Sequence, residues 1–74
     1  MKYDLVGVNG NAYAVMGYTV RALKREGLQD KVDEMYEKAK SGDYDNLLRV
    51  CMEYIDMANE AAEANGYEDE EEDW

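Results

Sequence analysis

The chain has 74 residues, a formal charge of −10, no histidine and a single cysteine, Cys51. This composition excludes an intrachain disulfide and the usual zinc sites, and the lack of an apolar run of about eighteen residues argues against a membrane span. The acidic balance disfavours direct nucleic-acid binding, which depends on Lys and Arg neutralising phosphates, and favours a protein partner with a basic surface.

The first predicted element is a short strand over residues 3–8, where apolar residues weakly alternate. The turn-forming residues Asn9, Gly10 and Asn11 interrupt it. Such a segment must pair with a second strand or with its copy in another chain, or lie against the helices as extended chain. Two continuations are open at this point. Either Asn9 or Asn11 caps a helix, or Asn9-Gly10 is a hairpin turn into a second strand over residues 12–20.

We favour the helix, because apolar residues recur at spacings of four, four and three on one face, at Ala12, Met16, Val20 and Leu23. Gly27 is the predicted stop. Gly17 inside this helix indicates either close approach of another backbone or simple tolerance.

A second helix is predicted over residues 29–40, ending at Ser41-Gly42, and a third from the cap residue Asp43 to Asn65-Gly66. The third has the strongest periodicity, at Tyr44, Leu47, Leu48, Cys51, Tyr54, Ile55, Ala58 and Ala62. The predicted fold is mostly α, with a short N-terminal strand followed by a three-helix bundle. Residues 1–66 form the helical domain, and residues 67–74 form a disordered acidic tail.

The tail is one candidate partner-binding site, because an acidic run tipped by an aromatic residue can enter a basic groove that has an apolar pocket. Its residues are Glu68, Asp69, Glu70, Glu71, Glu72, Asp73 and Trp74. This arrangement resembles the C-terminal tips of bacterial and phage single-stranded-DNA-binding proteins, which implies an accessory protein docking through its tail. The alternative is a tail that only keeps the chain in solution.

A second candidate surface consists of Tyr18, Met52 and Met57, because Tyr and Met suit adaptable interfaces and the two methionines lie off the main apolar stripe. Such a surface would meet a partner or a second copy of the chain. A homo-oligomer is expected on separate grounds also, since a domain this small has a marginal core.

An alternative site would bind a nucleotide or small anion between subunits. It combines the predicted helix start at Asn9, Gly10 and Asn11 with a basic patch. The basic patch consists of Arg21, Lys24 and Arg25. Cations in the last turns of a helix that complement its dipole are the simpler interpretation.

Catalytic chemistry is not expected. Cys51 lacks a histidine to activate it and falls on an apolar stripe, where a buried core cysteine is the simpler interpretation. The carboxylate pairs of the third helix are typical of a solvated face. We therefore predict no enzyme, no cofactor and no metal.

Several segments resemble a family of small uncharacterised proteins of phages, prophages and bacteria. They are Gly10-Asn11-Ala12-Tyr13, Met16-Gly17, the basic stretch 21–25 and the segment 41–48, whose pattern is SGDY-x-x-LL. The resemblance covers about residues 3–57 and implies no catalytic activity. With the charge, it leads us to expect a cytoplasmic, phage-encoded inhibitor of a host nucleic-acid-binding or defence protein, similar in role to an anti-CRISPR.

Overall fold

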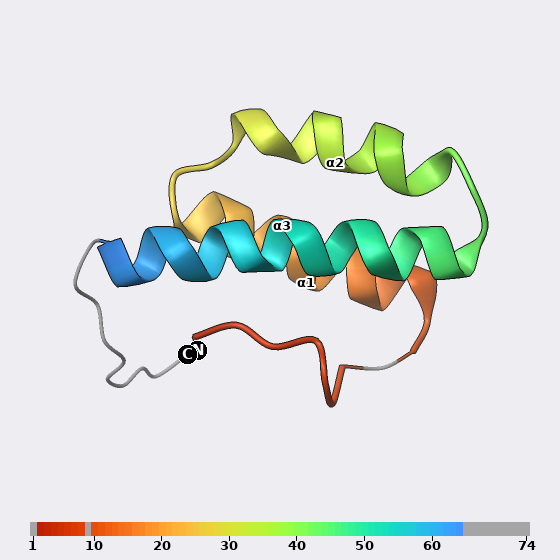
Figure 1. Ribbon diagram of the computed structural model, residues 1–74, viewed down its shortest axis with the longest axis horizontal. Helices are drawn as coiled ribbons and strands as arrows, with labels where there is room; N and C mark the ends of the chain where they lie inside the picture. Colours follow the sequence, from red (N-terminus) through yellow and green to blue (C-terminus); the bar gives the residue numbers. More distant parts are fainter. Residues whose placement is uncertain (1, 9, 65–74) are drawn as a thin grey trace.

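The computed structural model describes residues 2–8 and 10–64 and contains three helices: α1 (Ala12–Arg25), α2 (Asp30–Lys40) and α3 (Tyr44–Ala64). Successive helices run in opposite directions, and α3 lies along both of the others (Figure 1). The result is a compact all-α domain. Among the residues described, no helix is long and apolar enough to cross a membrane.

The start and end of α1 follow local sequence signals. The side chain of Asn11 accepts a hydrogen bond from the backbone N–H of Tyr13 at 2.8 Å, which confirms it as the cap. Gly27 has φ +76°, and the backbone N–H of Leu28 donates to the carbonyl of Leu23 at 2.8 Å, which closes the helix. The hairpin alternative for residues 12–20 is therefore wrong.

Gly17 has no close backbone neighbour. The nearest atom that an added Cβ would meet is the Arg21 guanidinium, at 3.7 Å. Of the two explanations for this glycine, tolerance holds and close packing does not.

The junction between α2 and α3 also follows the predicted signals. Asp43 caps α3 by accepting the backbone N–H of Asn46 at 3.0 Å. The side-chain amide of Asn46 then donates to the carbonyl of Lys38 at 2.9 Å, at the end of α2. One asparagine thus joins the end of one helix to the start of the next.

The predicted strand over residues 3–8 is wrong, because the described residues contain no strand. Residues 2–5 are extended, and a turn follows in which the backbone N–H of Val8 donates to Leu5 at 3.0 Å. A strand needs a second strand for its hydrogen bonds. Here side chains of α1 and α3 bond to this backbone instead. The predicted disorder of residues 67–74 lies outside the described residues.

The core lies where the apolar faces of the helices meet. Leu23 of α1, Met35 of α2, and Cys51 and Tyr54 of α3 are completely enclosed. Tyr3, from the extended segment, is enclosed as fully as they are. The burial of Cys51 confirms the interpretation of this cysteine as a core residue.

Candidate functional site

The segment of residues 2–8, here called the leading segment, runs along the side of the bundle away from α2 (Figure 1). Asn59 of α3 pairs with both backbone groups of Tyr3. Its Oδ1 accepts the Tyr3 N–H at 2.8 Å, and its Nδ2 donates to the Tyr3 carbonyl at 3.0 Å. On the α1 side, the hydroxyl of Tyr18 accepts the backbone N–H of Asp4 at 3.0 Å. The backbone is therefore held from both helices.

The side chain of Tyr3 reaches a buried carboxylate at the end of α1. Its hydroxyl donates to Oε2 of Glu26, and its ring packs edge-on against Tyr18. The Glu26 side chain is 1% exposed, and Lys2 Nζ lies 3.8 Å from the same Oε2. The other oxygen, Oε1, is buried and makes no hydrogen bond within residues 2–8 and 10–64.

Burial is the main cause that raises the pKa of Tyr3 well above its ordinary value, and the Glu26 carboxylate adds to it. The Arg25 side chain opposes this rise. Tyr3 therefore stays protonated and serves as a donor across the physiological range.

The outward face of α3 is predominantly acidic. Carboxylates recur along it at helical spacing, all exposed: Asp45, Glu53, Asp56, Glu60 and Glu63. Arg49 is the cation on this face of the helix, and beyond it the remaining four turns carry acidic side chains and no basic one. Cations are favoured near a helix C-terminus, because the helix dipole is negative there. The last turn of α3 instead carries Glu63 and no basic residue, so the charge along the second half of this helix is negative.

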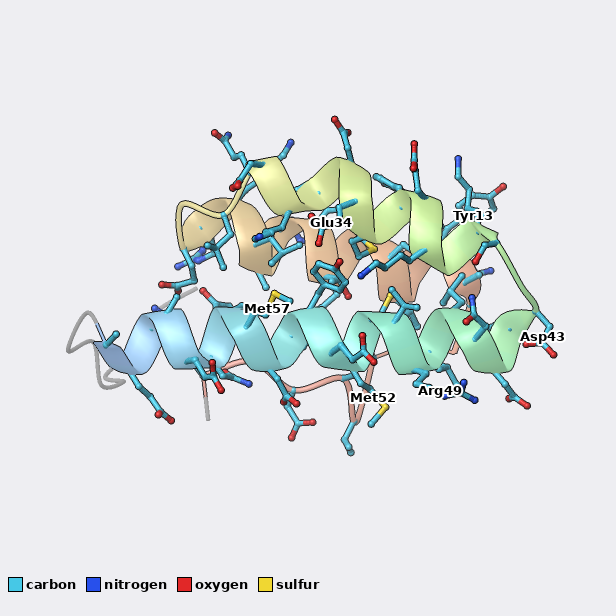
Figure 2. All side chains as sticks on the ribbon, turned by 45° about the horizontal axis from the view of Figure 1, so that its top comes forward. Tyr13, Glu34, Asp43, Arg49, Met52 and Met57 are labelled. Atoms are coloured by element: carbon cyan, nitrogen blue, oxygen red, sulfur yellow. The ribbon has the colours of Figure 1, made fainter. Side chains whose placement is uncertain are left out.

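The three residues predicted to form an apolar contact surface do not lie together. Met52 is 57% exposed and points away from α2, beside Arg49, whereas Met57 points toward α2 and packs against the core (Figure 2). Tyr18 is partly buried and holds the leading segment. Met52 alone of the three is a free apolar side chain, and it lies within the acidic face of α3.

The predicted anion site is not assembled within one chain. Asn11 caps the first turn of α1, whereas Arg21, Lys24 and Arg25 lie in its last turns, roughly 15–20 Å away at 1.5 Å per residue. The Gly10 carbonyl accepts a hydrogen bond from the Tyr44 hydroxyl. Asn9 lies outside the described residues.

The other described titratable side chains make contacts that stabilise the fold, and none of these contacts is arranged for catalysis. Burial raises the pKa of the Cys51 thiol, which makes it a poor nucleophile. The Tyr54 hydroxyl donates to Glu34 at 2.6 Å and thereby lowers the pKa of that exposed carboxyl. In the part of the chain that the structure describes, no group of three acidic or cysteine side chains could hold a metal ion.

Sequence reasoning missed Tyr3, Glu26 and Asn59 as a unit. One signal was available, because Asn59 falls four residues after Ile55 and three before Ala62, on the apolar stripe of α3. A buried amide needs partners. The spacing could not show that the partner lies 56 residues away. The acidic tail, Glu68 to Trp74, lies outside the described residues.

Comparison of the chain with protein-family models, with curated proteins and with solved structures gives no match.

Proposed function

We propose that this chain is a non-enzymatic acidic binding module that occupies the basic surface of a nucleic-acid-binding or defence protein. In this proposal it is a phage-encoded inhibitor acting in the bacterial cytoplasm. The proposal of a phage origin rests on the resemblance of residues 3–57 to small phage and bacterial proteins. The proposal that the chain binds a basic surface rests on its charge distribution.

The observation that carries the proposal is the second half of α3. Glu53, Asp56, Glu60 and Glu63 project from it with no basic residue in that half of the helix. Glu63 lies in the last turn, where the helix dipole makes a carboxylate least favourable. Features that disfavour the fold locally are expected where a surface serves binding. A row of carboxylates offers a basic groove what a phosphate backbone offers, namely regularly spaced negative charge.

Met52 supports contact with a protein rather than with free cations. It is a large, flexible apolar side chain, exposed within the acidic face (Figure 2). Interfaces typically surround apolar anchors with polar groups, and methionine adapts to the shape of its pocket. Burial of one such side chain contributes up to about 2 kcal/mol of binding free energy.

Two variants with equal charge changes test this proposal. The first neutralises α3 by Glu53→Gln, Asp56→Asn and Glu60→Gln. The matched control neutralises exposed carboxylates of α2 by Asp30→Asn, Asp33→Asn and Glu37→Gln. Affinity capture from bacterial lysate should recover a basic protein with wild type and with the α2 variant, and much less of it with the α3 variant. Equal loss in both variants, or a chain that captures only itself, would contradict the proposal.

The acidic tail is tested separately by removing residues 67–74. We propose that the tail strengthens binding through its charge, while α3 selects the partner. Truncation should then weaken capture of the same partner. Loss of a partner that the α3 variant retains would instead assign recognition to the tail, as in an accessory protein that docks through an acidic-aromatic tip.

Self-association is the second part of the proposal, because a domain of 74 residues has a marginal core that a second copy would extend. Sedimentation at high micromolar concentration should show a species larger than the monomer. A monomer throughout would refute this part alone.

A further inference from the structure

The seam between α1 and α3 holds residues 2–5 in the manner of a bound peptide. Asn59 bonds both backbone groups of Tyr3, and Tyr18 bonds the backbone of Asp4. Backbone hydrogen bonds do not depend on side-chain identity, which is how grooves that bind extended peptides gain general affinity. The seam can therefore hold a different extended segment by the same three bonds.

Specificity in this seam would come from Glu26, which receives the side chain of residue 3. Tyr3 gives it one donor, at Oε2, and leaves Oε1 buried and without a hydrogen bond within the described residues. A buried acceptor without a donor destabilises its surroundings. An arginine side chain supplies two parallel N–H donors that match both oxygens of a carboxylate. An arginine at this position could therefore donate to both oxygens of Glu26, whereas Tyr3 donates to one.

We propose that the α1–α3 seam is a peptide-binding site for an extended, arginine-bearing segment of the basic partner, and that residues 2–5 occupy it as an internal competitor. The arginine takes the place of Tyr3 and pairs with Glu26, while Asn59 and Tyr18 hold its backbone. This inference rests on the proposed function, since nucleic-acid-binding proteins are rich in exposed arginine.

Displacement of residues 2–5 is compatible with the connection that follows them. Gly7 has φ +93° in the turn that joins the segment to α1, and Val6 is almost fully exposed there. The bonds that hold residues 2–5 are separate from the cap of α1 at Asn11. The partner segment competes with residues 2–5, which are tethered next to the seam. Its apparent affinity is therefore the intrinsic affinity multiplied by the fraction of chains in which the seam is empty.

Two seven-residue fluorescent peptides test the inference by anisotropy on the full chain. One has the sequence of residues 2–8, and the other carries Tyr3→Arg. The Asp4→Pro chain is the key protein variant. It removes the backbone N–H that Tyr18 accepts, and so weakens the internal competitor without altering the seam. We expect it to bind the Tyr3→Arg peptide at least tenfold more tightly than wild type does.

Added Asn59→Ala should abolish that binding, and Glu37→Ala, at an exposed position of α2, should leave it unchanged. Circular dichroism confirms that each variant is helical. As a second readout, saturating peptide should shift the amide resonances of Glu26 and Asn59 in the wild-type chain. These shifts keep the test valid if a variant fails to fold.

Three results would overturn the inference: no peptide binding to the folded Asp4→Pro chain, binding that survives Asn59→Ala, or equal affinity for both peptides. A concentration-dependent dimer that exchanges residues 2–5 would overturn it too, because the occupant would then be a second copy. The assay contains no partner protein. If the peptide does not bind but lysate capture still depends on α3, only this inference is refuted. If the peptide binds but lysate capture does not depend on α3, the proposed function is refuted.

Discussion

Asn59→Ala should destabilise the domain by about 2–3 kcal/mol, although Asn59 lies within α3 and alanine has the higher helix propensity. The change removes the two hydrogen bonds to Tyr3, at 2.8 and 3.0 Å. Each contributes about 0.5–1.5 kcal/mol net. The two bonds together contribute about 1–3 kcal/mol, and the loss lies toward the upper end of that range, because the Tyr3 N–H and carbonyl either stay buried without partners or the segment lifts and exposes the ring. The better helix propensity of alanine offsets about 0.5 kcal/mol.

This loss is large for a chain of 74 residues, whose total stability is about 4–11 kcal/mol at typical values per residue. Urea denaturation followed by circular dichroism measures it directly. In a thermal melt the midpoint should fall by about 10–20 °C. Glu60→Ala is the control, because Glu60 is the exposed neighbour and its loss should change stability by less than about 0.5 kcal/mol. Equal stability of the two variants would refute the role of Asn59 in fixing the leading segment.

Three further predictions concern single groups. Asp43→Ala should cost about 1 kcal/mol through loss of the α3 cap, measured by urea denaturation; an unchanged midpoint would contradict the capping bond. The folded chain holds the Tyr3 proton more tightly than the unfolded chain, in which the pKa of this tyrosine is near the ordinary 10.0. The contribution of Tyr3 to the free energy of unfolding should therefore be constant below about pH 10 and fall as the pH rises above it. Tyr3→Phe should reduce the loss of stability above about pH 10, and parallel pH profiles of the two chains would contradict the role of Tyr3. Cys51 should react with a thiol reagent at pH 8 far more slowly in the native chain than in urea, since it is buried and the pKa of its thiol is raised; equal rates would show that it is exposed.

The helices were predictable because their signals are local. Asn11, Gly27 and Asp43 act within a few residues of their own positions, and the apolar spacing identifies most of the face that each helix buries. Tyr44 is the exception, since it falls on the predicted stripe of α3 and is 40% exposed. The hairpin alternative arose from Tyr13, Val15 and Thr19, which favour strands. Packing of α1 against α3 outweighs that preference, since Val15 and Thr19 are buried in the helical arrangement.

The leading segment was not predictable in the same way, because its contacts are distant in sequence. Tyr3 meets Glu26 and Asn59, which are 23 and 56 residues away. An alternating pattern of six residues predicted a strand over residues 3–8, but it does not say what satisfies that backbone, and residues 6–8 turn instead. The choice between a second strand and two polar side chains depends on tertiary structure.

The candidate surfaces were predictable in part. The sequence showed that the domain is acidic. The predicted apolar surface is not formed, because Met52 and Met57 point to opposite sides of α3 (Figure 2). Their separation follows from the helical repeat, since five residues turn a helix by about 140°. Tyr18 was expected to contact a partner and instead holds the chain's own leading segment.

In the proposed function, this chain and a nucleic acid compete for the same basic surface of the partner. The direct measurement is the affinity of the purified captured protein for the chain, with and without saturating nucleic acid at constant ionic strength. Release of the chain by nucleic acid, together with affinity that falls as salt rises, is the predicted result. A stable complex in which the partner binds the chain and the nucleic acid at the same time would contradict this competition.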